Sequence, residues 1–250
     1  MQFLEKRIEF LERVFYNGCE RTEYDMLKSI IFDMDGVLVN SEPVHYRAYL
    51  MALEPWGKTF SYEEYKTYVG TTNAVILDGL IRKFKLPITR DEFNEMMKEK
   101  KAYLYERDGY PGIDGVPELL ETLKAAGYTL AVASSSPYEN ILKATKALGI
   151  QEYFDVLISG ESVERSKPAP DVFWKAAEIL GTAPGDCLVV EDSCNGVRAA
   201  KNAGMACLGF VNPDSGNQDL SCAVRLTDSF REVDAAFVEA VYQKWEQSGL

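Results

Sequence analysis

The sequence predicts an α/β protein with a doubly wound parallel sheet and an inserted helical domain. The first observation behind this prediction is a series of short runs that are apolar almost throughout, as is typical of parallel strands covered on both faces. These runs span residues 29–32, 129–133, 156–158, 187–190 and 206–210. The second observation is the helical pattern between the runs, in segments that mostly end at a glycine. These segments span residues 116–126, 138–148, 170–180 and 196–203.

A third observation is the long interval between the first two predicted strands, which lie about 95 residues apart in the chain. A single crossover helix needs only a few dozen residues. Helical patterns fill the interval, at residues 44–53, 62–68, 74–84 and 90–106. We therefore expect a helical cap domain over residues 43–108, inserted into an α/β core of residues 26–42 and 109–250. Tyr110-Pro111-Gly112 is the expected return hinge.

Residues 1–25 form an extension ahead of the core. Leu4, Ile8, Leu11 and Phe15 recur at helical spacing, which predicts an amphipathic helix over about residues 2–16. Charged residues are scattered through this segment, so it lacks the apolar stretch of a signal peptide. We assign it no chemistry.

The overall charge disfavours two classes of partner. Lys and Arg total 27 against 39 Asp and Glu, a formal net charge of −12. Nucleic acids and anionic membranes both require basic patches, and no apolar run approaches the roughly 20 residues that span a bilayer. The cysteines show no C-x-x-C spacing, as expected of reduced thiols in the cytoplasm. We therefore expect a cytoplasmic protein, a monomer or weak dimer, whose partner is a small molecule.

Chemically reactive side chains follow four of the predicted strands. Ligands bind outside the carboxyl ends of the strands in open parallel sheets, so these residues should converge on one edge. They are Asp33 and Asp35 after the first strand, Ser134, Ser135 and Ser136 after the second, Lys167 beyond the third, and Glu191 and Asp192 after the fourth. Solvated loops also carry polar groups, but they do not explain carboxylate pairs that directly follow two separate apolar runs.

This set of residues predicts phosphoryl transfer. Two or more carboxylates and a backbone carbonyl form a hard oxygen site suited to Mg²⁺. The ion and Lys167 would neutralise a phosphate within an acidic protein, while Ser134 and nearby backbone N–H groups hold its other oxygens. Asp33 can then attack phosphorus and form an aspartyl-phosphate. Asp35 alternates to the same face and can protonate the leaving oxygen, then activate water.

Four motifs, in order along about residues 27–230, resemble those of the haloacid dehalogenase (HAD) superfamily. They are Asp33-Met34-Asp35-Gly36-Val37, Ser134, Ser166-Lys167-Pro168 and Glu191-Asp192-Ser193. The resemblance implies a Rossmann-like core in which Asp33 is the nucleophile and Asp35 the acid/base. It also implies that Ser134 and Lys167 hold the phosphate, with Ser135 beside them.

The same resemblance implies Mg²⁺ as the cofactor. Its ligands would be the Asp33 carboxylate, the Asp35 carbonyl and Asp192. Glu191 would be either an additional ligand or a side chain that supports the ligands.

The place of the insertion, directly after the first motif, resembles the helical-cap subclass of the superfamily. This subclass includes phosphoglycolate phosphatase, small sugar-phosphate phosphatases and β-phosphoglucomutase. Asn40-Ser41-Glu42-Pro43 resembles its first hinge, although the usual residue at Asn40 is aspartate. His45, the only histidine, stands where β-phosphoglucomutase has a histidine near the hinge. It has either a functional role, in orienting substrate or assisting Asp35, or a structural one.

The Gly70-Thr71-Thr72-Asn73 segment resembles a cap loop that reaches over the active site in this subclass. Gly70 and Thr71 are therefore candidate substrate-binding residues. β-Phosphoglucomutase has an arginine in this loop that holds the second, non-transferred phosphate, whereas Asn73 stands there in this chain. A neutral amide is a poor substitute for a bidentate cation. Other cap residues could supply the charge, although lysines on a helix usually form a solvated face; they are Arg82, Lys98, Lys100 and Lys101.

We therefore predict a Mg²⁺-dependent phosphatase, that is, a phosphoric monoester hydrolase of the HAD superfamily. We expect its substrate to be a small phosphate ester, namely a sugar phosphate, and the reaction to pass through an aspartyl-phosphate. The alternative is a hexose-phosphate mutase of the β-phosphoglucomutase type, an intramolecular phosphotransferase, which the missing arginine disfavours. A 2-haloacid dehalogenase is disfavoured because it needs no metal and would leave the Glu191-Asp192 pair idle. A catalytically silent binding protein would have a damaged motif, and none is damaged.

Overall fold

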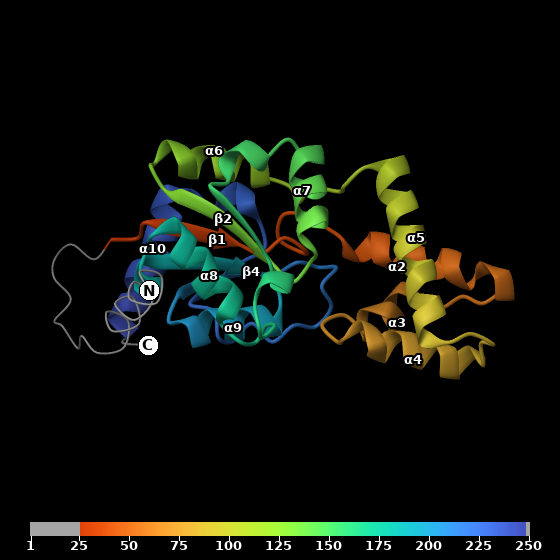
Figure 1. The fold of residues 1–250 in the computed structure, drawn as a ribbon. Helices are drawn as coiled ribbons and strands as arrows, with labels where there is room; N and C mark the ends of the chain where they lie inside the picture. Colours follow the sequence, from red (N-terminus) through yellow and green to blue (C-terminus); the bar gives the residue numbers. More distant parts are fainter. Residues whose placement is uncertain (1–25, 249–250) are drawn as a thin grey trace, which may run out of the picture.

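The computed structural model describes residues 26–248, so the helix expected in residues 1–25 lies outside the described residues. Within the described part, six strands form one parallel sheet in the order β3-β2-β1-β4-β5-β6 (Figure 1). The strands are β1 (Ser29–Phe32), β2 (Thr129–Ser134), β3 (Val156–Ser159), β4 (Cys187–Glu191), β5 (Ala206–Phe210) and β6 (Arg225–Thr227). The predicted doubly wound parallel sheet is confirmed. The direction of winding switches between β1 and β4, where ligands bind in folds of this kind.

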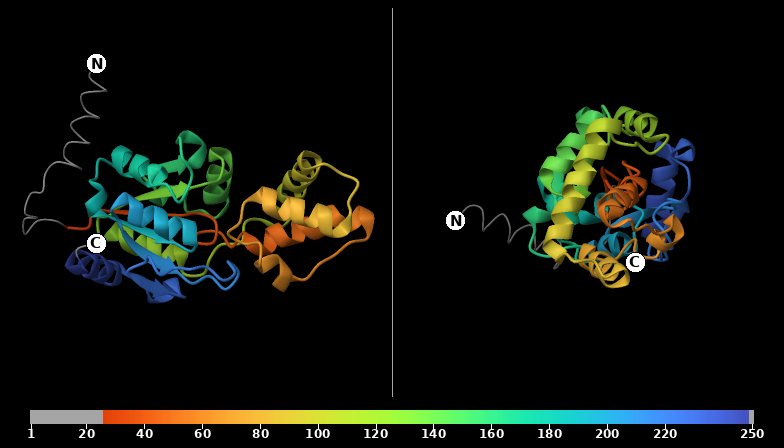
Figure 2. Two further views of the ribbon diagram at one scale, coloured as in Figure 1. Left: turned by 90° about the horizontal axis from the view of Figure 1, so that it is seen from below. Right: turned by 90° about the vertical axis from the view of Figure 1, so that its right-hand side faces the viewer.

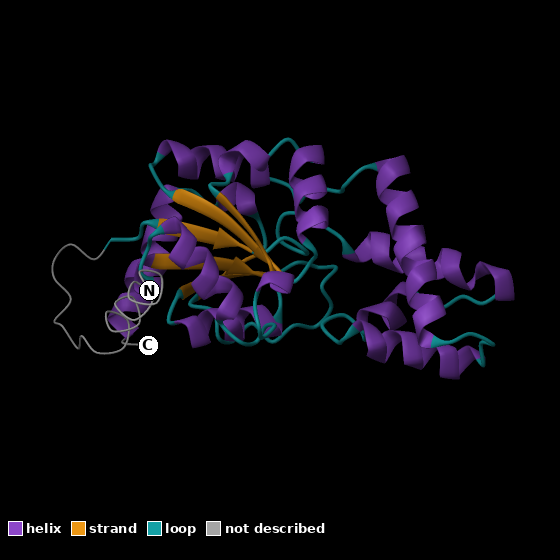
Figure 3. Cartoon of the chain, viewed as in Figure 1, coloured by secondary structure: helices purple, strands orange, loops and turns teal. Residues whose placement is uncertain are grey.

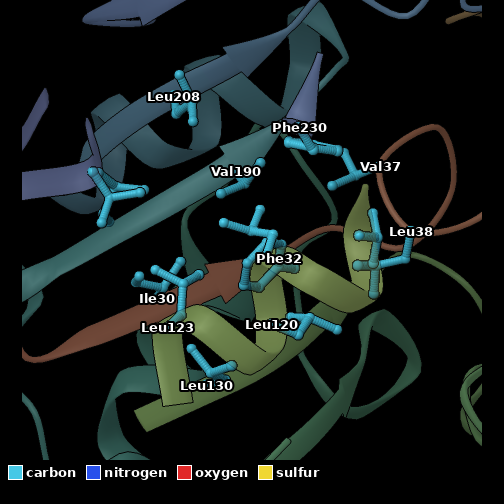
Figure 4. Close-up of a cluster of buried hydrophobic side chains, with 14 of the residues drawn as sticks. Ile30, Phe32, Val37, Leu38, Leu120, Leu123, Leu130, Val190, Leu208 and Phe230 are labelled. Carbon is cyan, nitrogen blue, oxygen red and sulfur yellow. The ribbon is translucent and has the colours of Figure 1, made fainter. Parts of the chain in front are cut away.

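Two hydrophobic clusters cover the two faces of the sheet. Ile30 and Phe32 of β1 belong to one cluster and Ile31 to the other, because successive side chains of a strand point to opposite faces. The first face is covered by α6 (Val116–Ala125), α7 (Tyr138–Ala147) and α10 (Ala235–Ser248), and the second by α8 (Asp171–Leu180) and α9 (Cys194–Ala203). Figure 4 shows Phe32 within the first cluster, close to Leu120 of α6. Each such buried side chain contributes roughly 1.5–3 kcal/mol, so both faces stabilise the sheet.

The remaining described helices form a separate group, called here the helical unit (residues 42–108). They are α2 (Glu42–Leu53), α3 (Tyr62–Lys66), α4 (Asn73–Phe84) and α5 (Arg90–Asp108). The helical unit lies beyond the carboxyl ends of the strands (Figure 2). It has a hydrophobic cluster of its own, which includes Tyr49, Leu80 and Phe93. Figure 3 shows helices and loops, and no strand, in residues 42–108 of the described chain.

Two neighbouring chain segments connect the helical unit to the sheet. Asn40 N donates to Pro111 O at 2.8 Å, and Ile113 N donates to Leu38 O at 3.1 Å. Val39 and Gly112 form an isolated antiparallel bridge between the same segments. The outgoing and returning chains therefore run side by side at the expected hinge.

The eight helices predicted between residues 44 and 203 are present, and their ends differ from the prediction by at most two residues. The prediction missed β6 and α10. β6 has three residues, two of them exposed, so it lacks an apolar run. α10 carried a detectable signal, since Val238, Val241, Tyr242 and Trp245 are buried at helical spacing.

Short 3₁₀ helices complete the described secondary structure. They are η1 (Glu54–Trp56), η2 (Gln151–Tyr153), η3 (Gly160–Ser162), η4 (Pro184–Asp186) and η5 (Phe230–Glu232). Among the residues that the structure describes, no helix combines the length and the apolar character needed to cross a membrane.

Candidate active site

The carboxyl ends of β1, β2 and β4 open onto a cavity of about 180 Å³, called here the small cavity. It lies at the switch point of the sheet, opposite the helical unit. Predicted site residues form much of its lining, namely Asp33, Asp35, Gly70, Ser134, Ser135, Lys167, Glu191 and Asp192. The structure therefore brings together residues from the chain segments at or after the ends of β1, β2, β3 and β4 and from one loop of the helical unit. Thr71 and His45 are not part of this lining.

Lys167 is the buried cation of the small cavity. Its Nζ donates to Asp33 Oδ1 at 2.6 Å, to Glu191 Oε1 at 2.7 Å and to the Ala133 carbonyl at 3.1 Å. The Lys167 side chain is 7 % exposed. Burial alone would lower the pKa of Lys167, but the charges of Asp33 and Glu191 outweigh it and raise that pKa. Lys167 is therefore held as a cation.

Both oxygens of Glu191 are engaged. Lys167 binds Oε1, while the backbone N–H groups of Asp192 and Ser193 and the Ser193 hydroxyl each donate to Oε2 at 3.0 Å. The carboxylate lies against the first turn of α9, where a Cβ on Gly196 would meet Glu191 Oε1 at 1.8 Å. Glycine at position 196 thus makes room for this carboxylate.

Asp33, Glu191 and Asp192 form a buried acidic cluster whose oxygens lie within 4.8 Å of one another. Burial raises the pKa of Asp33 to about 7, with Lys167 opposing the shift and Glu191 adding to it. Burial, followed by the charges of Glu191 and Asp33, raises the pKa of Asp192 well above its usual range. One lysine therefore does not compensate three neighbouring carboxylates. Their oxygens fit a divalent cation, which prefers carboxylate ligands and would supply the missing positive charge.

Asp35 is held by Ser136, a residue that the sequence places after the second predicted strand without a role in the site. The Ser136 hydroxyl donates to Asp35 Oδ2 at 2.7 Å, and the Ser136 N–H donates to Ser134 Oγ at 3.0 Å. Ser134 is buried, whereas Ser135 is exposed at the cavity wall. The signal for Ser136 was its place as third serine in the run that follows β2.

A second, larger cavity of about 970 Å³, called here the large cavity, lies between the helical unit and the sheet. Its polar lining includes Asp35, His45, Asn73, Asn94, Lys98, Lys101, Tyr105, Tyr110, Ser136, Asn140 and Lys143. Asp35 lines both cavities. The predicted acid/base thus lies where the two spaces meet.

His45 lines the large cavity next to the partly buried Glu42. Its Nδ1 lies 3.9 Å from Glu42 Oε2. Burial lowers the pKa of His45 to about 4, with the charge of Lys101 adding to this and Asp35 opposing it. His45 is therefore neutral at neutral pH. Burial raises the pKa of Glu42 to about 7, although the Tyr65 hydroxyl donates to the Glu42 carboxylate.

Asn73 is fixed within the helical unit. Its side-chain carbonyl accepts from the Tyr49 hydroxyl at 3.1 Å, and its amide donates to Asn94 Oδ1 at 2.7 Å. Thr72 occupies the N-cap position of α4 without a side-chain capping bond. The predicted site residue Thr71 is exposed, and its hydroxyl donates to the Tyr68 carbonyl at 2.6 Å. The structure places Asn73 at the large cavity and Thr71 outside the lining of both cavities.

Two of the four candidate cations line the large cavity. They are Lys98, which also pairs with Glu95 at 2.7 Å, and Lys101. Burial lowers the pKa of Lys101, while the charges of Asp35 and Glu42 oppose that shift. Lys100 and Arg82 do not belong to the lining of this cavity. Lys101 is thus the cation of α5 most closely associated with Asp35.

Comparison with known proteins gives matches over most of the chain. A sequence profile of the haloacid dehalogenase-like hydrolases matches residues 30–210. A phosphorylated carbohydrates phosphatase from Thermotoga maritima is 32% identical over 179 residues, which cover 72% of this chain and 82% of that protein. The crystal structure of CbbY from Rhodobacter sphaeroides in complex with xylulose-(1,5)bisphosphate has a TM-score of 0.69 at 29% identity, covering 83% of this chain and 96% of CbbY. A putative β-phosphoglucomutase from Thermotoga maritima has a TM-score of 0.71 at 29% identity, covering 88% of this chain and 99% of the other.

Proposed function

Because the chain belongs to the haloacid dehalogenase-like hydrolase family, we propose that its substrate is a small sugar phosphate. Like its relatives, the chain is a phosphoric monoester hydrolase that acts on phosphorylated metabolites. We further propose that hydrolysis depends on Mg²⁺ and passes through an aspartyl-phosphate on Asp33. The observation that carries this proposal is that the site consists of two cavities that meet at Asp35. Asp33 lines the small charged cavity, while Asp35 lines both that cavity and the large one.

Asp33 has the surroundings of a nucleophile. Lys167 binds its Oδ1, and within the described chain no hydrogen bond engages its Oδ2. The Ser134 oxygen accepts the Ser136 N–H, so the hydrogen of the Ser134 hydroxyl is available to a phosphoryl oxygen. Ser134 and Ser135 would hydrogen-bond the transferred group beside Asp33, and the positive charge of Lys167, whose three N–H donors already bind Asp33, Ala133 and Glu191, would neutralise it. Attack of the carboxylate on phosphorus forms the acyl phosphate and releases the leaving oxygen toward the large cavity.

Asp35 is placed to serve the leaving oxygen. Its position at the junction of the two cavities matches a group that protonates the departing alcohol and then removes a proton from the attacking water. Ser136 holds one of its oxygens and leaves the other for this proton transfer. His45 is neutral there, so it can orient the leaving group by hydrogen bonding without adding charge.

The metal would be held by the Asp33 carboxylate, the Asp35 carbonyl and Asp192. Glu191 is less available than the other two acids, because four donors already engage its oxygens. We therefore propose that Glu191 supports Lys167 and the start of α9 rather than binding the ion directly. Bound Mg²⁺ would supply positive charge to the phosphoryl oxygens in an acidic site.

The large cavity supports a polar leaving group. Asn94 and Asn140 offer amides that suit sugar hydroxyls, and Lys101 offers a cation for a further acidic substituent. We propose that residues 43–108 act as the cap that excludes water from the reaction and selects the substrate.

The second candidate function is a hexose-phosphate mutase. Lys101 favours it, because this lysine could hold the second phosphate that an arginine binds in β-phosphoglucomutase. Asn73 disfavours it, because its amide is committed to Tyr49 and Asn94. The phosphatase remains the better supported function.

A metabolite panel tests both functions in one experiment. Phosphate release from sugar phosphates is measured with Mg²⁺ and with a chelator, beside a coupled assay for conversion of β-glucose 1-phosphate to glucose 6-phosphate. We expect Mg²⁺-dependent phosphate release that Asp33→Asn abolishes. Efficient conversion with little release would favour the mutase, and activity that survives Asp33→Asn would exclude the assigned nucleophile.

A further inference from the structure

We propose that Ser215 is a positioning residue for Asp192, and that the loop carrying Ser215 couples the metal site to the helical unit. This loop, residues 212–218, follows β5 and reaches the sheet edge that bears the small cavity. The inference rests on the proposed function, since it assigns a metal to Asp192. It adds a control element outside the four sequence motifs.

The first part of the argument is the setting of the Asp192 carboxylate. Asp192 is 5% exposed and Ser215 is 4% exposed. The Ser215 hydroxyl donates to Asp192 Oδ2, and a Cβ on Gly36 would meet the same oxygen at 1.9 Å. The carboxylate is thus enclosed between the first motif and the loop. Within the described chain no hydrogen bond engages Asp192 Oδ1, so Ser215 determines which oxygen is left for a cation.

The second part is the attachment of the loop to the hinge. Asn212 Nδ2 donates to the Gly36 carbonyl at 2.9 Å. Asn40 Nδ2 donates to Asp214 Oδ2 at 2.7 Å. An aspartate at position 40, the usual residue in this subclass, would place a carboxylate against Asp214. The amide of Asn40 instead makes an attractive contact, so the departure at this hinge position suits the loop.

The third part is the attachment of the loop to the helical unit. The Tyr62 hydroxyl of α3 donates to Asp214 Oδ1 at 2.9 Å. Gln218 Nε2 donates to the Val69 carbonyl at 3.4 Å. A Cβ on Gly216 would meet the Lys66 carbonyl at 2.8 Å, so glycine at this position lets the two chains approach.

These contacts place one loop between two parts of the site. Asp214, which is bound to Tyr62, is the immediate neighbour of Ser215, which is bound to Asp192. Displacing the helical unit would therefore pull on the residue that orients the carboxylate. By thermodynamic linkage, a cation that favours this orientation also favours the docked helical unit. Through this loop, the Asp192 carboxylate would be fully oriented for the metal only when the helical unit is docked against residues 212–218.

The positioning role is tested by the Mg²⁺ affinity of the 250-residue chain, measured by calorimetry without substrate. Residues that orient metal ligands typically contribute roughly 10- to 100-fold in affinity. We expect Ser215→Ala to weaken Mg²⁺ binding about tenfold and Ser215→Thr, which keeps the hydroxyl, to restore most of it. Ser221→Ala is the matched control, because Ser221 is exposed and lies beyond the loop. Circular dichroism checks that each variant is folded.

The coupling is tested with Tyr62→Phe, which removes the hydroxyl that binds Asp214 and keeps the ring. We expect a weakening of Mg²⁺ binding of a few fold, and a Ser215→Ala, Tyr62→Phe double variant no weaker than Ser215→Ala alone. Tyr103→Phe, at an exposed tyrosine of α5, is the control and should bind as the wild type does. Unchanged affinity in Tyr62→Phe would overturn the coupling.

The outcomes separate this inference from the proposed function. Equal Mg²⁺ affinity in the wild type and Ser215→Ala, with the wild type hydrolysing phosphate esters, would overturn the role of Ser215 alone. A wild type that binds no Mg²⁺ would overturn the metal site and this inference together.

Discussion

Lys167 Nζ lies 2.6 Å from Asp33 Oδ1, and the same ammonium lies 2.7 Å from Glu191 Oε1. The cation therefore links the proposed nucleophile, which directly follows β1, with the acid at the end of β4. Three donors of Lys167 are used in these contacts and in the bond to the Ala133 carbonyl. The proposed nucleophile is thus fixed before any substrate binds, which is the preorganisation that electrostatic catalysis requires.

Lys167→Met is expected to destabilise the chain by about 3–5 kcal/mol, because it leaves two buried carboxylates without their cation. Urea unfolding at neutral pH measures this loss. Lys28→Met is the control, since the Lys28–Asp186 pair is largely exposed on the lysine side and such pairs contribute about 0–1 kcal/mol. Equal losses in the two variants would contradict the buried ion cluster.

Relative to the wild type, Glu42→Gln is expected to have a more favourable free energy of unfolding at pH 8 than at pH 5. The pKa of Glu42 is raised from 4.5 to about 7, so the folded state takes up its proton more readily than the unfolded state. Below pH 4.5 the carboxyl is protonated in both states and its burial carries no charge penalty. As the pH rises through 7, the folded state must bury a carboxylate, at a cost of up to roughly 3 kcal/mol.

Thermal and urea unfolding of Glu42→Gln and the wild type at the two pH values measure this difference. Glu63→Gln is the matched control, because the Glu63 side chain is 83% exposed. A stability gap between Glu42→Gln and the wild type that is the same at both pH values would contradict the burial of a charged Glu42.

Lys101→Met is expected to act on substrate selection. For substrates with a second phosphate or a carboxylate, we expect KM to rise about tenfold, because the variant loses a charge-assisted contact with the leaving group. For substrates with a neutral leaving group, KM should change by less than about twofold. Lys100→Met is the control, since Lys100 does not line the large cavity. Equal effects on both substrate classes would contradict the proposal that Lys101 binds an acidic substituent of the leaving group.

Gly36→Ala is expected to damage the site rather than the fold alone. Gly36 has a φ of 83°, which strains other residues by about 1–2 kcal/mol, and its added Cβ would also displace Asp192. Gly204→Ala isolates the first effect, because Gly204 has a φ of 69° and a Cβ there would meet nothing within 4 Å. Unfolding and Mg²⁺ titration should show strain in both variants and a loss of metal affinity only in Gly36→Ala.

Much of the fold could be predicted because it rests on local patterns. Continuous apolar runs marked β1 to β5, and the excess length after β1 marked the helical insertion. The predicted cluster of Asp33, Lys167 and Asp192 followed from the rule that ligands lie at the carboxyl ends of the strands.

The rest of the site depends on contacts that no local pattern encodes. Asn40 and Asp214 meet although 174 positions separate them, and residues 212–218 show neither helical nor strand periodicity. The availability of individual oxygens is equally hidden in the sequence. Glu191 and Asp192 look equivalent as neighbours, yet among residues 26–248 four donors engage Glu191 while Ser215 alone engages the Asp192 carboxylate.

The central claim is that Asp33 accepts the phosphoryl group. Its most direct test is rapid quenching of the Mg²⁺-loaded chain during turnover of its best substrate, followed by mass spectrometry of the peptide that contains Asp33. The Asp35→Asn variant is included because loss of the base should slow hydrolysis of the acyl phosphate. We predict one added phosphoryl group on Asp33, accumulating in Asp35→Asn and absent from Asp33→Asn. Turnover with no phosphorylated peptide in either the wild type or Asp35→Asn, or a phosphoryl group on another residue, would contradict the assignment.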